Sequence, residues 1–256
     1  MTALQNTDTA APVAPSRGVA ASLGLLIALG LLRTVLLLGT DGVSWLGFRT
    51  AGSTEPLRYA LLSSNVWIVA VDIVTLVVVA RLLTREGGSL RRLLNPRPIG
   101  KNLLWGLLAF AILLVAFVVA TYVANLSVYQ GPPPPVGTTR IRPPLWYGLW
   151  AILVMPATIA LAEESLYRGY LQPRFQARLG RVGSVVVVAV FFGLQHSAFA
   201  LGSVQAVVAR VLTTFLVGLV LGALYIWLKR LAPLVFAHWL IDVLGLGLPI
   251  LVLAVS

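Results

Sequence analysis

The sequence predicts an all-α polytopic membrane protein, a bundle of seven or eight transmembrane helices, on three observations. The chain of 256 residues is 59% hydrophobic and 11% charged, whereas a soluble domain has about a quarter of charged residues. Its apolar runs are long enough to cross a hydrocarbon core of about 30 Å. Lysine and arginine gather beside alternate runs, as in the cytoplasmic loops of membrane proteins. This composition argues strongly against a soluble enzyme.

Seven apolar runs account for the predicted spans. The first three form an N-terminal transmembrane region, 18–126, and the other four a C-terminal region, 145–256. The last run contains Gly245, Gly247 and Pro249, so it is either one bent helix or a short helix followed by an eighth segment. The predicted spans are 18–38, 59–83, 102–126, 145–168, 183–200, 204–228 and 231–254.

Basic residues set the expected orientation of the bundle. The loops after the second, fourth and sixth runs carry most of the lysines and arginines, and these loops share one side. The positive-inside rule places that side and the N-terminus in the cytoplasm, in a multi-pass protein of a bacterial inner membrane. Residues 1–17 are predicted to be a disordered cytoplasmic tail. Arg33 and Arg210 lie near the outer ends of their spans, so we expect both side chains to snorkel toward the interface.

The net charge and the missing cysteine limit the function further. A formal net charge of +11 reflects topology, since the basic residues lie beside spans rather than in a soluble, aromatic-rich segment, and we expect no nucleic-acid partner. The chain has no cysteine, which excludes disulfides, thiolate metal sites and a cysteine nucleophile. Any metal would be held by carboxylates and the only two histidines, His196 and His238.

Two adjacent glutamates near the end of the fourth predicted span are candidates for chemistry, because a charged side chain in hydrocarbon costs at least about 2.5 kcal/mol. On a helix Arg168 follows Glu164 by four residues and can pair with it, whereas Glu163 points about 100° away. We therefore expect one tied carboxylate and one free carboxylate that can act as a general base toward water. The alternative is that both glutamates face water at a helix end.

The two histidines lie in different spans. His196 follows Phe192 by one helical turn, so the Phe192 ring forms a wall for the imidazole. A single intramembrane histidine is as often an interhelical hydrogen-bonding group as a catalytic one. His238 and Asp242 share one helix face, where a carboxylate can fix the tautomer of the imidazole. The alternative for this pair is a buried polar lock between two helices.

Three of these side chains converge in depth. At about 1.5 Å per residue, Glu163, His196 and His238 lie roughly 18, 22 and 12 Å from the cytoplasmic boundary. A carboxylate and two imidazoles around one water form either a zinc site with an open position or a metal-free general-base site. Both arrangements suit hydrolysis of a peptide bond. Asp72 has no motif partner, and we expect it to hydrogen-bond to a neighbouring helix, with a role in substrate gating as the alternative.

Three short motifs occur in order, each on its own span: Glu163-Glu164-x-x-x-Arg168, Phe192-x-x-x-His196 and His238-x-x-x-Asp242. They resemble the motifs of the CPBP family, which includes CAAX prenyl endopeptidases of the Ras-converting type, bacteriocin-processing proteins and Abi proteins. The resemblance covers about the C-terminal 100 residues up to Asp242 and implies an intramembrane endopeptidase. Region 145–256 would then be the catalytic transmembrane region.

The resemblance also implies a role for each motif residue. Glu163 would activate the water, His196 would assist it, and His238 with Asp242 would stabilise the oxyanion. The third motif of the family often ends in Asn, so Asp242 would orient His238, ligate a metal or act protonated. Supporting positions are Glu164, Arg168 and Phe192. A zinc ion held by Glu163, His196 and His238 and a metal-free glutamate mechanism are both open.

The implied partners are membrane lipid and a peptide or membrane-protein substrate, of the CAAX or the bacteriocin-leader type. The sequence indicates no particular substrate and no oligomeric state. Two other functions remain open. One is a catalytically silent immunity or scaffold protein of the same fold. The other, less favoured because the chain lacks paired halves with broken helices, is a small proton-coupled transporter.

Overall fold

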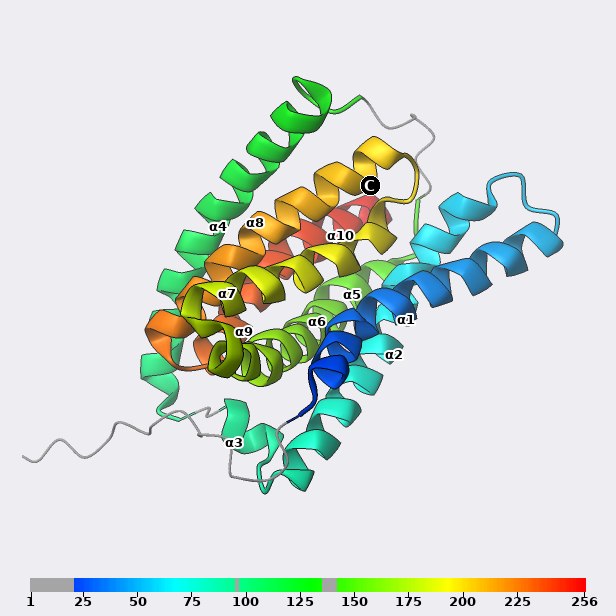
Figure 1. Cartoon of the computed structure of the whole chain (residues 1–256). Coiled ribbons are helices and arrows are strands. Elements are labelled where there is room, and N and C mark those ends of the chain that lie inside the picture. Colours follow the sequence, from blue (N-terminus) through cyan, green and yellow to red (C-terminus); the bar gives the residue numbers. More distant parts are fainter. Residues whose placement is uncertain (1–20, 95–96, 135–141) are drawn as a thin grey trace, which may run out of the picture.

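The computed structural model describes residues 21–94, 97–134 and 142–256, which form helices joined by turns (Figure 1). The predicted all-α class is confirmed, while the predicted tail, 1–17, lies outside the described residues. In chain order the elements are α1 (Leu23–Thr50), α2 (Pro56–Arg85), α3 (Leu90–Leu94), α4 (Ile99–Tyr129), α5 (Leu145–Leu153), α6 (Met155–Glu163), the π-helical η1 (Glu164–Leu171), α7 (Gln172–Gln195), the 3₁₀ turn η2 (His196–Ala200), α8 (Val204–Leu228), α9 (Ala232–Asp242), the π-helical η3 (Val243–Gly247) and α10 (Leu248–Val255).

Six helical stretches among the described residues are long and apolar enough to cross a membrane. One of them, Leu145–Ala200, has 56 residues, far more than the roughly 20 that span a bilayer. Its helix is interrupted at Gly180, where φ is 70°. Figure 1 shows the chain running one way through α5 and α6 and returning through α7. This stretch therefore contains two of the predicted spans. The six stretches together supply seven helical segments that can cross the membrane.

The C-terminal span is one continuous stretch, Ala232–Val255. The sequence left open whether an eighth segment begins near Gly245. In the structure the glycines fall in η3, where the helix widens without ending, and α10 follows directly. Pro249 lies at the start of α10, directly after the wider turn of η3. The bent-helix alternative is the one observed.

The first span is longer than predicted. Its apolar run ends at residue 38, but α1 continues to Thr50. A buried polar contact explains the extension: Ser64 of α2 donates a hydrogen bond to Asp41 of α1, and both side chains are almost fully buried. The hydrogen bond from Ser64 offsets the cost of burying the Asp41 carboxylate, so the helix can continue past it. The hydropathy of the first segment alone does not reveal this partner.

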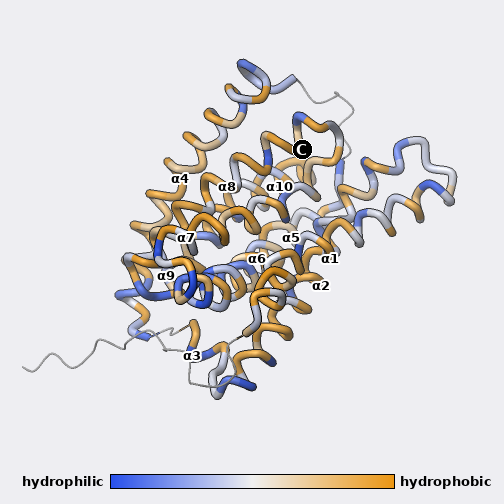
Figure 2. The backbone as a smooth tube through the Cα atoms, viewed as in Figure 1, coloured by the Kyte–Doolittle hydropathy of each residue, from blue (hydrophilic) through white to orange (hydrophobic). Residues whose placement is uncertain are grey.

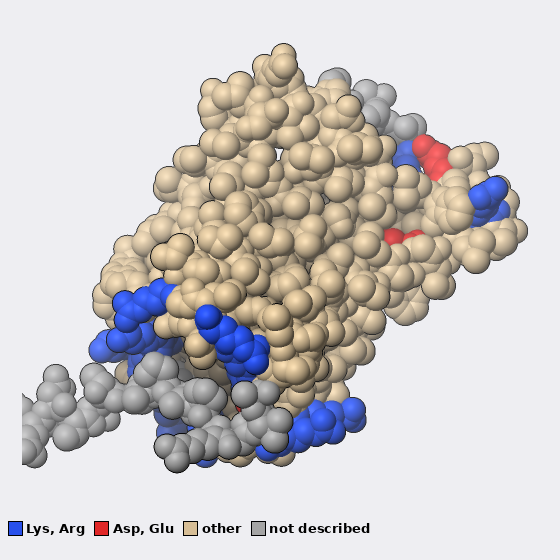
Figure 3. All heavy atoms as spheres, viewed as in Figure 1, with Lys and Arg blue, Asp and Glu red and all other residues tan. Residues whose placement is uncertain are grey.

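The outer surface of the bundle is apolar, as expected for contact with lipid. On α4, large side chains such as Val115 and Val118 are more than 60% exposed. Figure 2 shows apolar residues along the helices, with hydrophilic ones mainly near their ends. In Figure 3 most of the visible basic side chains gather at the end of the molecule where α3 lies. This distribution fits a multi-pass membrane protein, and the predicted cytoplasmic N-terminus stays a prediction.

Close packing of α7 against α8 brings two walls of the site together. A Cβ atom at Gly193 would lie 3.0 Å from the carbonyl oxygen of Val211, and one at Gly218 would lie 3.1 Å from the Phe192 ring. A side chain at either position would press on the other helix, so glycine favours this close approach. As a result the end of α7, which carries the second motif, lies against the middle of α8.

Candidate active site

The motif residues lie where regular α-helix stops. Glu163 is the last residue of α6 and Glu164 the first of the wider π-helical η1. His196 follows α7 and begins a tighter 3₁₀ turn. Asp242 ends α9, directly before the second π-helical segment. Such breaks change the direction of neighbouring side chains and are frequent at functional sites. Spacing arguments that assume 3.6 residues per turn do not predict them.

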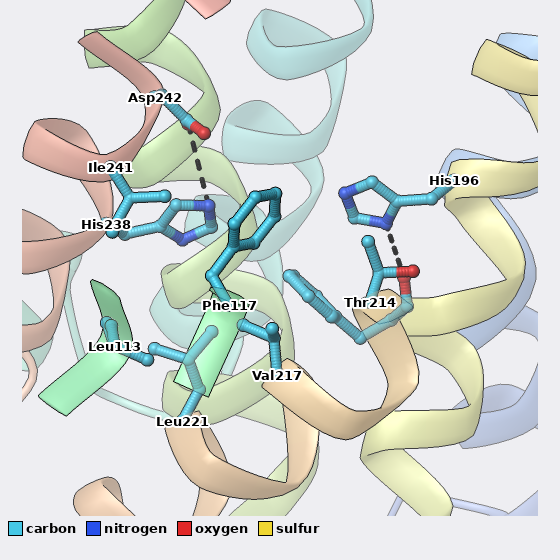
Figure 4. A pocket seen from close by; sticks show the side chains of 10 residues that line it. Leu113, Phe117, His196, Thr214, Val217, Leu221, His238, Ile241 and Asp242 are labelled. Carbon is cyan, nitrogen blue, oxygen red and sulfur yellow. Dashed lines mark hydrogen bonds and ion pairs between the residues drawn. The ribbon is translucent and has the colours of Figure 1, made fainter. Parts of the chain in front are cut away.

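A small pocket between α4, α7, α8 and α9 brings four motif residues together (Figure 4). Its cavity of about 60 Å³ can hold water, since one water needs about 10–15 Å³. Figure 4 shows His196 and His238 on opposite sides of it, with Asp242 beside His238. The remaining walls are largely apolar. The lining residues are Leu113, Phe117, Phe192, His196, Thr214, Val217, Leu221, His238, Ile241 and Asp242.

His196 is oriented by its own helix. Its Nδ1 lies 2.7 Å from the carbonyl oxygen of Phe192. A carbonyl only accepts, so Nδ1 carries the proton, and the neutral ring keeps its lone pair on Nε2. The Phe192 ring lies 4.9 Å from the His196 ring and 6.1 Å from the His238 ring between centroids. Phe192 is thus a wall for both histidines, whereas the sequence predicted it for His196 alone.

Glu164 and Arg168 form a buried pair, as their spacing predicts. Arg168 Nη1 lies 3.1 Å from Glu164 Oε1, and neither side chain is exposed to solvent. The same oxygen accepts a hydrogen bond from His238 Nδ1 at 2.8 Å. The Arg168 guanidinium also lies 4.2 Å from the centre of the Phe192 ring. One carboxylate therefore connects the first motif to the third.

Asp242 is farther from His238 than Glu164 is. Its Oδ2 lies 3.5 Å from His238 Nε2, beyond the usual length of an N–H···O hydrogen bond. The shorter contact from Glu164 to Nδ1 therefore fixes the tautomer and the ring plane of His238. Position 164 thus performs the orienting task that the sequence offered as one role for Asp242.

Glu163 is not the free carboxylate that the sequence predicted. Arg33 Nη2 of α1 lies 3.0 Å from Glu163 Oε1. The prediction failed because helical spacing reveals partners on the same segment, and this partner lies 130 positions away. The other oxygen, Oε2, lies 3.8 Å from His238 Nε2. Oε2 is buried and accepts no hydrogen bond from the described residues.

Arg33 does not snorkel, contrary to expectation. Its side chain is fully buried, because two carboxylates and an amide hold it inside the bundle. Nη1 lies 2.5 Å from Asp72 Oδ1 and Nε lies 2.7 Å from Gln195 Oε1. The expected hydrogen bond of Asp72 to a neighbouring helix is thus confirmed. Sequence reasoning missed Arg33 and Gln195, although an arginine in one span and an aspartate in the next were the available signal.

The three predicted zinc ligands do not form a metal centre in this arrangement. Among the described residues, no group of three or more histidines and carboxylates is placed to hold a metal ion. Oε1 of Glu163 is bound to Arg33, and Nδ1 of His238 is bound to Glu164. These contacts use only one atom of each side chain, so the zinc site stays a prediction, and the chemistry below is derived from the side chains alone.

A family model supports the interpretation of the motifs. The model of Rce1-like type II CAAX prenyl endopeptidases matches residues 144–244. No curated protein and no solved structure matches the chain. The matched segment begins just before α5 and ends just after Asp242, so it contains all three motifs and leaves α1 to α4 outside. The region that carries the site is thus similar to the Rce1-like type II CAAX prenyl endopeptidases, in agreement with the resemblance that the motifs carry.

Proposed function

We propose that the protein is an intramembrane endopeptidase that hydrolyses a peptide bond of a membrane-associated or exported substrate, of the CAAX or bacteriocin-leader type. The observation that carries this proposal is the meeting of His196, His238 and Asp242 at one small pocket, with Glu163 beside His238. Buried ionisable groups are expensive within a membrane, and an enclosed polar group of this kind marks a functional site.

The reaction begins with a water molecule held between Glu163 and His196. Oε2 of Glu163 has no hydrogen-bond donor among the described residues, and it accepts one proton of the water as general base. Nε2 of His196 accepts a hydrogen bond from the other O–H, since Nδ1 is occupied by the Phe192 carbonyl. The water oxygen then attacks the carbonyl carbon of the peptide bond.

His238 stabilises the charge that develops on the carbonyl oxygen. Glu164 holds Nδ1–H at 2.8 Å, so an imidazolium ring at this position directs its Nε2–H toward the oxyanion. The protonated Glu163 then gives its proton to the amide nitrogen, and the carbon–nitrogen bond breaks. The products are a carboxylic acid and an amine, which become a carboxylate and an ammonium group when the acid proton passes to the amine, and Glu163 returns to its ionised form.

The apolar walls of the pocket suit a hydrophobic side chain next to the cleaved bond. Leu113 and Phe117 of α4 and Val217 and Leu221 of α8 line the pocket. A substrate residue that enters here removes apolar surface from water, at about 25 cal/mol per Å². An aliphatic residue beside the cleaved bond fits this environment better than a charged one.

The test is cleavage of quenched fluorescent peptides by the purified protein in detergent. The panel contains a prenylated CAAX peptide, the same peptide without prenyl, and a leader peptide. We expect Glu163→Gln to lower kcat by about 10³-fold, since a general base contributes 10²–10⁴-fold. Glu55→Gln is the matched control, because that side chain is 51% exposed and lies far from the pocket; its rate should equal that of the wild type.

The same experiment separates the alternatives. A silent scaffold protein cleaves no peptide, and Glu163→Gln leaves its cellular phenotype intact. A transporter loses flux in this variant without changing the length of any partner. Addition of a chelator distinguishes a bound metal from a glutamate base: unchanged cleavage in the chelator supports the glutamate base, and loss that zinc restores contradicts it.

A further inference from the structure

A fully buried arginine of the first helix joins three elements around the site. Arg33 of α1 donates hydrogen bonds to Asp72 of α2, Glu163 of α6 and Gln195 of α7. We propose that Arg33, anchored by Asp72, is a positioning residue that holds Glu163 in the orientation required for hydrolysis. This inference rests on the proposed function and adds a role for a helix outside the region that matches the family.

The geometry of the guanidinium group carries the argument. Its nitrogens Nη1, Nη2 and Nε each face a different partner, at 2.5, 3.0 and 2.7 Å. The group is planar and its donors are fixed in one fork, so it cannot rotate without losing a contact. Glu163 Oε1 is therefore held in place. Its second oxygen is directed toward His238, whose Nε2 lies 3.8 Å away.

Asp72 is the anchor of this arrangement. It lies at the centre of α2, is fully buried, and its nearest cation is Arg33. Without it, Arg33 would be free to move toward Glu163 and the pocket. Gln195 provides a second anchor: its Oε1 accepts from Arg33 and from the hydroxyl of Tyr167 at 3.2 Å. Because Gln195 precedes His196, the same guanidinium sets the distance between the first and second motifs.

The position of these residues in the chain adds to the argument. The family match begins at residue 144, whereas Arg33 and Asp72 lie on α1 and α2. The matched region contains Glu163 but lacks the group that binds its Oε1. In this protein the N-terminal helices therefore complete the site rather than only covering it.

The experiment must separate positioning from simple stabilisation. Removing Arg33 alone leaves two buried carboxylates without a partner, which can unfold the protein. The double variant Arg33→Met, Asp72→Leu removes one positive and one negative charge together, and such replacements of buried pairs are often tolerated. It leaves Glu163 Oε1 without its donor, which is the contact under test. The matched control is Asp41→Leu, Ser64→Ala, which removes another buried polar contact between α1 and α2 away from the pocket.

We expect the Arg33→Met, Asp72→Leu protein to fold and to lose about 10- to 100-fold in kcat, with KM changed less than about twofold, since misplacing a catalytic group costs up to 10²-fold. Arg33→Lys keeps the positive charge but loses the planar set of hydrogen-bond donors, so its kcat should lie between those of the wild type and of the Arg33→Met, Asp72→Leu protein. The Asp41→Leu, Ser64→Ala control should keep the wild-type kcat even if its unfolding temperature falls. An unchanged kcat in the folded Arg33→Met, Asp72→Leu protein overturns the inference.

A second measurement does not depend on catalysis. Unfolding temperatures of Arg33→Met, Glu163→Gln and the combined variant form a double-mutant cycle. We expect non-additive effects, because Arg33→Met removes the donor of Glu163 Oε1 and Glu163→Gln removes the charge that Arg33 contacts, and additive effects overturn the inference. If the wild type cleaves no peptide, the proposed endopeptidase fails, and this cycle still decides whether Arg33 holds Glu163.

Discussion

Arg168 and Arg33, the two buried arginines of the site, differ in how far along the chain their partners lie. We call Arg168 with Glu164 the local cluster, and Arg33 with Asp72, Glu163 and Gln195 the long-range cluster. Arg168 and its partner Glu164 are four residues apart in one segment, η1. Arg33 has partners that lie 39, 130 and 162 positions away along the chain. Both guanidinium groups are fully buried, and each holds one of the two adjacent glutamates.

The difference shows how one pair of glutamates acquires two tasks. Glu164 has its ion-pair partner within η1 and also binds His238 of α9. Glu163 obtains its partner only when α1 and α2 pack against the region that matches the family. The local cluster orients an imidazole, and the long-range cluster orients the proposed base. The active geometry therefore depends on the docking of the N-terminal helices.

The largest expected effect on stability comes from breaking the local cluster. Arg168→Met removes the partner of Glu164 and leaves a carboxylate buried beside His238. Loss of one partner from a buried pair typically costs about 3–5 kcal/mol. Unfolding followed by tryptophan fluorescence in detergent measures this change. Arg58→Met at the exposed pair with Glu55 is the control and should change the free energy of unfolding by less than about 1 kcal/mol. Equal effects in the two variants would contradict the comparison.

Much of the fold could be predicted because the signals lie within single segments. The apolar runs indicate the spans, and the spacing of Glu164 and Arg168 indicates their pair. The motif order indicates the family, which the match to residues 144–244 supports. These inferences need only composition, helical periodicity and local spacing. They require no knowledge of which helices become neighbours.

The rest of the site depends on tertiary packing. Arg33 lies near the outer end of an apolar run, which equally fits a snorkelling side chain, and only the packing of α1 against α2 and α7 decides between these fates. Similarly, the spacing within its own helix gives Glu163 no partner, and its ion pair is formed with Arg33 of a different helix. The π-helical turns after Glu163 and Asp242 also escape periodicity, because they break the 3.6-residue repeat itself.

A substitution of Phe192 tests whether one side chain orders both His196 and Arg168. Its ring contacts His196 and the guanidinium of Arg168, so Phe192→Leu removes a cation–π contact and leaves a small void. We expect a loss of about 1–2 kcal/mol in unfolding free energy and a fall of roughly 10-fold in kcat through the less ordered imidazole. Phe48→Leu, which changes an aromatic contact with Tyr59 away from the pocket, is the control. A stability loss without any change in kcat would limit Phe192 to packing.

Asp242→Asn should have the smallest effect on kcat. It tests whether Glu164 or Asp242 orients His238. Glu164 lies 2.8 Å from Nδ1, whereas Asp242 lies 3.5 Å from Nε2. If the shorter contact fixes the imidazole, Asn at 242 keeps the shape and a polar group, and kcat should fall by less than about threefold. Glu164→Gln should lower kcat by at least about 10-fold, because a charge-assisted hydrogen bond contributes roughly twice a neutral one. A larger fall in kcat for Asp242→Asn than for Glu164→Gln would contradict this assignment. The negative charge of Asp242, rather than that of Glu164, would then be the group that orients His238 toward the oxyanion.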